Sequence, residues 1–235
     1  MAATSGILLT YRWLLASVIA ISSSSGLATS GALDIALDTK LHEDHVGPIT
    51  FVADSVTLNC NGHQVSAPGE FQTILIQERT RITVKNCKIT GAVYGIYVVR
   101  STDIVIKDNI AFGNEGTGMF YTGSQSLTIK NNVATNNGVA GMDVQFVTNS
   151  TVQHNTASNN GFFGFLILVV DGSAFSHNVA SGNRAFGFIL FSSYGNLLST
   201  NSACGQQVDL LLDTIVPGAN VLKHDNFCIV EEQVS

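Results

Sequence analysis

A repeat of 23 residues runs without a gap through the middle of the chain. Five glycines open successive units at this spacing: Gly95, Gly118, Gly141, Gly164 and Gly187. A fixed period of roughly 20 to 50 residues is typical of solenoids, in which each unit stacks on the next. The repeat therefore limits the fold to a stack of similar coils.

The residues inside each unit favour strands over helices. Short alternating runs of Ile, Val, Phe and Thr are broken by Gly and Asn, and no unit carries an apolar stripe at helical spacing. A leucine-rich repeat would need a leucine-dominated pattern, which is absent. Two or three short strands per unit, joined by tight polar corners, describe a parallel β-helix, and we predict an all-β solenoid of about eight coils.

Equivalent positions in the units hold the same type of residue. Since stacked coils lie about 4.8 Å apart, such residues should lie directly above one another. We expect two columns of asparagine to pass side-chain hydrogen bonds from coil to coil, and alanines to fill a place where two walls approach closely. The columns are Asn109, Asn132, Asn155, Asn178 and Asn201; Asn114, Asn137, Asn160 and Asn183, then Gln206; and Ala111, Ala134, Ala157, Ala180 and Ala203.

The N-terminus resembles a secretory signal. Arg12 precedes the apolar run "WLLASVIAI", and small residues follow it. We predict a signal peptide over 1–32, with cleavage between Gly26 and Ala32, and an uncleaved anchor is the alternative. Residues 33–46 should cap the solenoid, residues 47–228 should form it, and residues 229–235 should be a tail. The protein is therefore expected to be secreted, either extracellular or periplasmic, with no membrane segment after cleavage.

Charge and cysteine content narrow the class further. The chain has 17 acidic and 11 basic residues, so no net positive field favours nucleic acid or an anionic membrane, although a local basic strip stays possible. Four cysteines suit disulfides in an exported chain. Cys204 and Cys228 are 24 residues apart, close to one period, and we predict that they pair. Cys60 and Cys87 are one column out of step, which leaves their pairing open.

Two stretches before the exact repeat carry a family resemblance. "ADSVTLNCNGHQVSA" and "ITVKNCKITG", followed by the repeated asparagine and glycine pattern, resemble right-handed parallel β-helix proteins of the pectin-lyase-like superfamily. The nearest subgroups are NosD-type repeats and mannuronan C5-epimerase-type modules. The resemblance implies a protein that binds or modifies an acidic polysaccharide, as a uronate lyase or epimerase would. A non-catalytic, partner-binding or NosD-like accessory protein is the alternative.

One stretch resembles the epimerase motif Y-G-x-D-P-H-E. In "AGMDVQF", Gly141 and Asp143 match, whereas Ala140, Gln145 and Phe146 replace the tyrosine, histidine and glutamate. The resemblance makes Asp143 a candidate catalytic residue, with the proton-transfer partners missing. Asp143 should share an outward column with Tyr97, Phe120, Leu166 and Ile189, so Tyr97, Phe120 and Gln145 are candidate substrate contacts.

Two stacked pairs are further catalytic candidates. Lys107 and Lys130 could act as a base or neutralise a substrate carboxylate, or they could be ordinary solvated lysines. His154 and His177 could act as acid and base, or they could simply be corner residues in a polar column. The run "HEDH" at His42 to His45 lacks a third ligand, so no metal site is predicted there. We expect no cofactor, although calcium at the Asp- and Asn-rich corners stays possible.

An apolar group should project from two neighbouring coils. Its members are Leu166, Leu168, Ile189 and Phe191. A contiguous exposed apolar patch indicates a partner, a stacking platform or a covering segment. A protein partner and a cover formed by the C-terminal tail are both compatible with the sequence.

Overall fold

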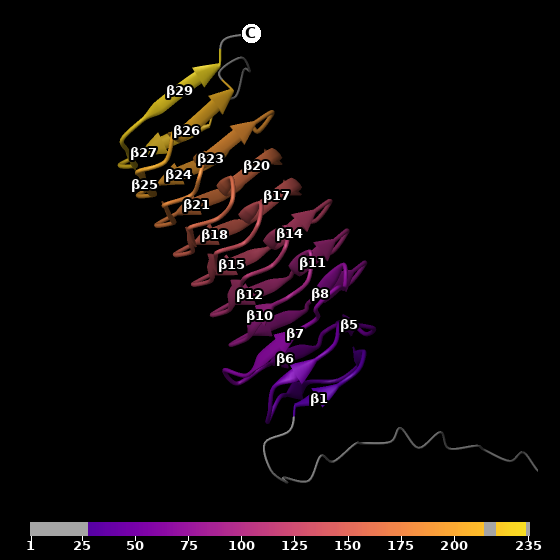
Figure 1. Ribbon diagram of the computed structural model, residues 1–235. Helices are drawn as coiled ribbons and strands as arrows, with labels where there is room; N and C mark the ends of the chain where they lie inside the picture. The colour runs from indigo at the N-terminus through magenta and orange to yellow at the C-terminus, as the bar shows by residue number, and fades with distance from the viewer. Residues whose placement is uncertain (1–27, 214–219, 234–235) are drawn as a thin grey trace, which may run out of the picture.

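The chain forms a single stack of coils with no helix among its described residues (Figure 1). The computed structural model describes residues 28–213 and 220–233. It is a right-handed parallel β-helix of about eight turns with a spacing of about 23 residues, which confirms the predicted fold.

Three parallel sheets, here named A, B and C, run the length of the stack, and each coil contributes one strand to each sheet. Sheet A consists of β1 (Thr29–Ser30), β4 (His45–Val46), β7 (Gln64–Ser66), β10 (Lys88–Thr90), β13 (Ile110–Phe112), β16 (Val133–Thr135), β19 (Thr156–Ser158), β22 (Val179–Ser181), β25 (Ser202–Cys204) and β28 (Asn226–Phe227).

Sheet B contains the longest strands. Its members are β2 (Leu33–Ile35), β5 (Ile49–Phe51), β8 (Gln72–Gln77), β11 (Tyr94–Val99), β14 (Thr117–Thr122), β17 (Ala140–Thr148), β20 (Phe163–Asp171), β23 (Phe186–Phe191), β26 (Val208–Asp213) and β29 (Val230–Gln233).

Sheet C is built from short strands. They are β3 (Thr39–Lys40), β6 (Thr57–Asn59), β9 (Thr83–Lys85), β12 (Val105–Lys107), β15 (Thr128–Lys130), β18 (Thr151–Gln153), β21 (Ala174–Ser176), β24 (Leu197–Ser199) and β27 (Val221–Lys223).

The core fills the bore between the three sheets. Inward side chains stack on their equivalents one coil away, so that Val144 pairs with Tyr121 on one side and Ile167 on the other. All three are fully buried. Because every coil places apolar residues at the same positions, burial of these columns stabilises each coil against its neighbours.

The two asparagine columns form the predicted hydrogen-bonded ladders. Asn132 shows the pattern: its Nδ2 donates to Asn155 Oδ1 at 3.0 Å and to the Ile106 carbonyl at 2.8 Å. The Asn155 oxygen also accepts from the backbone N–H of Asn132 at 2.9 Å. One buried side chain thus satisfies polar groups of three consecutive coils, which is the requirement for a polar group inside a core.

The glycine that opens each unit is needed for close packing. A Cβ placed on Gly141 would lie 2.7 Å from the Cβ of Ala157 and 2.8 Å from Nδ2 of Asn160. The second asparagine ladder and the alanine column therefore occupy the space that any larger residue at Gly141 would need. This explains why glycine, alanine and asparagine recur together at fixed offsets.

The corner between sheets C and A requires a left-handed backbone. Its column has φ angles between 54° and 58° at residues that are not glycine: Asp108, Asn131, His154, His177 and Thr200. Asn, Asp and His are the non-glycine residues most enriched in this conformation. The corner therefore accounts for the polar residues at this position by backbone geometry.

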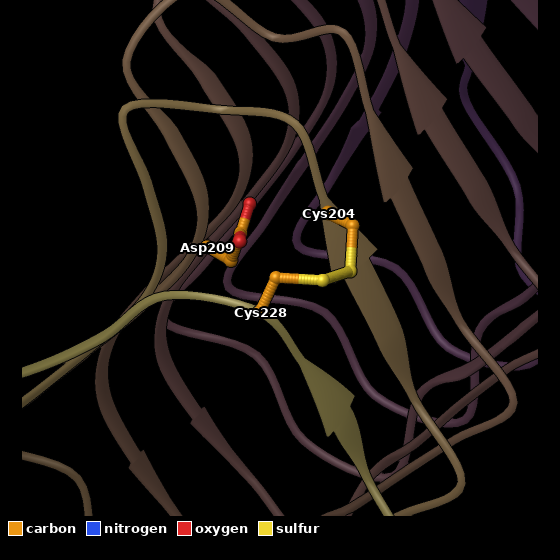
Figure 2. Close-up of side chains that lie close together, drawn as sticks. All are labelled: Cys204, Asp209 and Cys228. Carbon is orange, nitrogen blue, oxygen red and sulfur yellow. A yellow bond between two sulfur atoms is a disulfide. The ribbon is translucent and has the colours of Figure 1, made fainter.

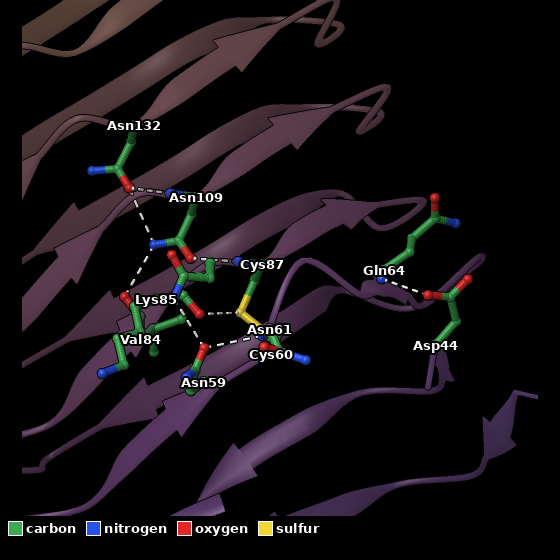
Figure 3. Close-up of a disulfide and its surroundings, with 11 residues drawn as sticks. Asp44, Asn59, Cys60, Asn61, Gln64, Val84, Lys85, Cys87, Asn109 and Asn132 are labelled. Atoms are coloured by element: carbon green, nitrogen blue, oxygen red, sulfur yellow. Dashed lines mark hydrogen bonds between the residues drawn. A yellow bond between two sulfur atoms is a disulfide. The ribbon is translucent and has the colours of Figure 1, made fainter. Parts of the chain in front are cut away.

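Both pairs of cysteines are bridged. The predicted Cys204–Cys228 bond is present with a Cα–Cα distance of 5.2 Å, and Cys60–Cys87 is also bonded, at 4.8 Å. Figure 3 shows that the backbone N–H of Cys87 donates to Asn109, so Cys87 occupies the place where the ladder begins. The one-column offset that left this pair open in the sequence is therefore compatible with a disulfide.

Both ends of the stack are made of strands. Residues 29–46, which include the predicted cap, supply β1 to β4, and these pair with the next coil. The predicted tail contains β29, which pairs with β26 and extends sheet B. Most of the predicted signal segment, residues 1–27, lies outside the described residues. Within the described part of the chain, no helix has the length and hydropathy to cross a bilayer.

Replacing Asn155 by Ala tests the ladder. The change leaves the Asn132 amide without its acceptor and leaves the Ile129 carbonyl without a donor. We expect a loss of about 2–4 kcal/mol in the free energy of unfolding, because buried polar groups become unsatisfied. Urea denaturation measures it, with the neighbouring corner change His154→Asn as control. A loss below about 0.5 kcal/mol for Asn155→Ala would contradict a structural role for the ladder, since surface changes fall within that range.

Candidate functional site

The outer face of sheet B carries the candidate catalytic aspartate. Strand pairing places Asp143 opposite Phe120 on one side and Leu166 on the other, with Tyr97 and Ile189 one coil further in each direction. The outward column predicted from the repeat is therefore confirmed. Ala140, where the epimerase motif has tyrosine, is fully buried, and Phe146 lies at an exposed corner.

Asp143 is buried although its column faces outward. Only 8% of the residue is exposed, because Phe120 and Leu166 flank the shorter aspartate. Gln145 Nε2 lies 3.0 Å from both carboxylate oxygens and donates to them. Burial raises the pKa of Asp143 to about 6, and the hydrogen bond from Gln145 offsets part of that rise.

An aromatic cluster lies beside Asp143 on the same face. The rings of Tyr94, Tyr97 and Phe120 are stacked with centroids 5.2–5.4 Å apart, and Phe71 meets Tyr94 edge-on at 5.0 Å. Asp143 also contributes to raising the pKa of Tyr94, after the larger effect of burial. The sequence analysis found Tyr97 and Phe120 but missed Tyr94, which directly precedes the glycine of its unit, and Phe71, which lies before the exact repeat.

On the C-terminal side of Asp143 the same face is apolar. The predicted group projects outward as expected, but its members cover one another: Ile189 is only 4% exposed, and Leu166, Leu168 and Phe191 are half-buried. The prediction of an exposed patch is therefore wrong for Ile189, because bulky residues stack above and below it. The C-terminal tail does not cover this face through β29, since that strand extends the sheet edge instead.

The two lysine candidates lie on a different sheet from Asp143. Lys107 and Lys130 are register partners on the outer face of sheet C. Lys85 pairs with Lys107 in the same column, and Asn59 connects that row to Lys40. The looser spacing of the first coils concealed these additional lysines in the sequence. The structure therefore separates the proposed carboxylate-neutralising pair from the aspartate.

The histidine pair lies at the corner between sheets C and A, and not beside Asp143. The rings of His154 and His177 are parallel within 3°, with centroids 4.7 Å apart. Both residues are exposed. Stacked parallel rings direct their nitrogen lone pairs side by side, so the pair does not converge on one ion in this arrangement.

One cluster of metal-ligating residue types occurs within the described residues. Figure 2 shows Cys204, Asp209 and Cys228 close together near the C-terminal end. The two sulfurs are joined to each other, and Asp209 accepts backbone hydrogen bonds from Gln206 and Ile229. Oxidised sulfurs are not thiolate ligands, so this cluster closes the last coil.

The "HEDH" run divides between the outside and the inside of the first coil. His42 is exposed, whereas His45 is buried, with its Nδ1 2.9 Å from the hydroxyl of Thr29. Burial lowers the pKa of His45. The two imidazoles therefore do not share a site.

Several solved structures share this fold. The chain matches the enzymatically active domain of tailspike protein 2 from bacteriophage CBA120 (11% identity, TM-score 0.55), covering 80% of this chain and 38% of that one. It matches pectate lyase Pel9A (13%, 0.51), covering 88% and 68%. It also matches a lidless DFA-IIIase from Arthrobacter chlorophenolicus A6 in complex with GF2 (14%, 0.52), covering 86% and 64%. The chain thus spans 38% to 68% of the length of these structures, and identities this low show the fold alone.

A search of curated proteins found no significant match. A family model does match residues 53–215, which is more than half of the chain, and it is described as "Periplasmic copper-binding protein (NosD)". Copper in proteins is bound by imidazole nitrogen and by thiolate or thioether sulfur.

The described residues do not fit a copper centre. Their cysteines are oxidised, Met119 and Met142 are fully buried, and the stacked histidine pair has no third His, Cys, Asp or Glu ligand close to it. The match concerns the repeated strands and corners, which extend over most of the described solenoid. On the extent of that match, the chain belongs to the NosD family of β-helix proteins.

Proposed function

We propose that the outer face of sheet B binds a saccharide chain without cleaving it. The observation that carries the proposal is the buried carboxylate of Asp143 on an outward column, beside the cluster of Tyr94, Tyr97 and Phe120. Sugars present apolar C–H faces and hydroxyl groups together, and aromatic rings next to a carboxylate and an amide complement both. The names of structural neighbours, pectate lyase among them, support this class of ligand.

Asp143 has hydrogen-bonding capacity to spare. A carboxylate offers about four acceptor positions, and within the described residues Gln145 is its one side-chain donor. Two hydroxyl groups of a sugar would fill the remaining positions. The half-buried Gln145 would then contribute its own carbonyl oxygen as a further acceptor.

The same face lacks the groups that catalysis requires. Proton abstraction from a uronate needs a cation to stabilise the charge that develops on the substrate carboxylate. No Lys, Arg or His occurs in any strand of sheet B that the structure describes. Hydrolysis needs a second carboxylate about 5 to 10 Å away, and the positions paired with Asp143 hold Phe120 and Leu166. These absences favour binding over turnover.

A protein partner is the second candidate, and the NosD family membership is compatible with such an accessory role. The half-buried Leu166, Leu168 and Phe191 lie on the same face, directly next to Asp143. The two disulfides suit the oxidising compartment in which either ligand would be met.

Asp143 imposes a cost on folding that a purely structural residue would not need. Its folded pKa lies above the reference value of 3.8, so the folded state binds the proton more tightly than the unfolded state. Its contribution to stability is therefore greatest below pH 4 and is lost as the pH rises through 6. Retention of an ionisable group at such a position is typical of functional sites.

Asp143→Asn should stabilise the protein near neutral pH. We expect a gain of about 1–3 kcal/mol at pH 7 that disappears near pH 4, because the neutral amide has no ionisation to suppress. Urea denaturation at several pH values measures it, with the exposed Asp103→Asn as control. A gain that is independent of pH, or shared by the control, would show that ionisation of Asp143 is not the cause.

Binding can be tested with a matched pair of aromatic variants. Phe120→Ala removes a ring of the sheet B cluster, whereas Phe112→Ala removes an outward ring of sheet A. We expect Phe120→Ala and Asp143→Asn to weaken binding of glycan-array hits at least tenfold in titration calorimetry, and Phe112→Ala to leave it unchanged.

The same preparations report on catalysis. Wild type and Asp143→Ala should release no unsaturated uronates from alginate or pectate. Release by wild type alone would establish a lyase and overturn the non-catalytic proposal, and absence of binding to every saccharide on the array would overturn it altogether.

A further inference from the structure

Five of the six lysines of the chain stand in one column on the outer face of sheet C. The column reads, in strand order, Lys40, Asn59, Lys85, Lys107, Lys130, Gln153, Ser176, Ser199 and Lys223. Three of these lysines, Lys85, Lys107 and Lys130, are direct neighbours on adjacent strands. The sixth lysine, Lys88, lies on sheet A.

This column is positive on a chain of net negative charge. The formal charge of the whole chain is −6, yet no strand of sheet C contains Asp or Glu. Among the described residues, the three ion pairs involve His63, Arg79 and Arg100, and none involves a lysine. Like charges directly opposite each other on neighbouring strands are destabilising. The fold thus maintains an unneutralised row of ammonium groups at a cost in stability.

Hydroxyl and amide groups accompany the lysines. Thr83, Thr128 and Thr151 occupy the other outward column of the same strands, and Gln153 and Ser176 continue the lysine column towards the C-terminus. A linear polymer along this face would therefore meet positive charge and hydrogen-bonding groups in alternation. No aromatic residue faces outward here, since Phe175 of β21 is buried in the core.

We infer that the lysine column of sheet C binds a linear acidic polysaccharide laid along the axis of the solenoid. Strands in a sheet are about 4.8 Å apart, so neighbouring ammonium groups repeat over a distance comparable to one sugar unit. A polyuronate carries one carboxylate per sugar and can pair with such a row, while its hydroxyl groups meet the threonines. The inference goes beyond the saccharide site on sheet B, because it concerns another face and another ligand chemistry.

A narrow row favours a polyuronate over other polyanions. Duplex DNA carries about one charge per 1.7 Å of axis and is usually met by a broad basic surface. An anionic bilayer likewise attracts clustered basic residues, and the remaining surface of this chain carries the excess of negative charge. A single row matches a single thin chain of moderate charge density.

The test uses polygalacturonate and alginate oligomers as probes, with the full chain and titration calorimetry at two salt concentrations. Lys107→Glu should reduce affinity at least tenfold at low salt, whereas Lys88→Glu, with the same change in net charge, should reduce it less than twofold. Wild-type binding should weaken as salt rises, because ionic contacts are screened. An equal loss in both variants would show a general charge effect and overturn the inference.

A neutral triple variant guards against misfolding. Lys85→Gln, Lys107→Gln and Lys130→Gln together extend the residue type found at Gln153, and they should raise the thermal midpoint by relieving repulsion. Full polyuronate affinity in this folded variant would contradict the inference. So would tighter lysine-dependent binding to duplex DNA or to phosphatidylglycerol vesicles.

Phe120→Ala separates this inference from the proposed function. It should leave polyuronate affinity intact, so the two sites can fail independently. A parallel loss of polyuronate binding in Phe120→Ala would show that one site on sheet B accounts for both ligands and would overturn the assignment to sheet C.

Discussion

Asparagine side chains that bond from one coil to the next hold the whole structure in a single register. Each ladder amide, as at Asn132, connects backbone groups of neighbouring coils inside a bore that excludes water. A slip of one residue would leave these amides unpaired and turn every strand inside out, since side chains alternate between the two faces. The ladder therefore specifies one stacking arrangement among many that hydrophobic burial alone would tolerate.

A fixed register also determines the surface. Whatever a coil presents outward is placed directly above the same position of the previous coil, so small sequence preferences accumulate into columns. Sheet B strands contain no basic residue and carry aromatic and apolar side chains around Asp143, whereas sheet C strands contain no acidic residue and carry five lysines. The two faces are chemically distinct although one repeat built both, and both proposals rest on that difference.

The exact repeat explains how much could be predicted from sequence. From Gly95 onward the spacing is constant, so the ladders, the alanine column, the outward column of Asp143 and the Cys204–Cys228 bridge could all be predicted. Before Gly95 the coils vary in length. That irregularity hid the alignment of Lys85 with Lys107 and left the Cys60 bridge open.

Burial depends on neighbours that the repeat does not describe. Asp143 faces outward as predicted, but its burial results from the larger residues that stack on either side and from the hydrogen bond with Gln145. Ile189 is covered in the same way. The histidine pair needed the backbone angles of its corner before its position could be explained without a ligand.

Exchange of asparagine side-chain amides tests the ladder most directly. In a chain labelled with ¹⁵N-asparagine, NMR distinguishes side-chain NH2 groups that exchange with water rapidly from those that are protected. The buried ladder residues, such as Asn132, Asn155 and Asn160, should be protected, while exposed corner residues such as Asn131 and Asn159 should exchange rapidly. Equally rapid exchange in both groups would contradict the account, because the stack would then lack the interaction that sets its register.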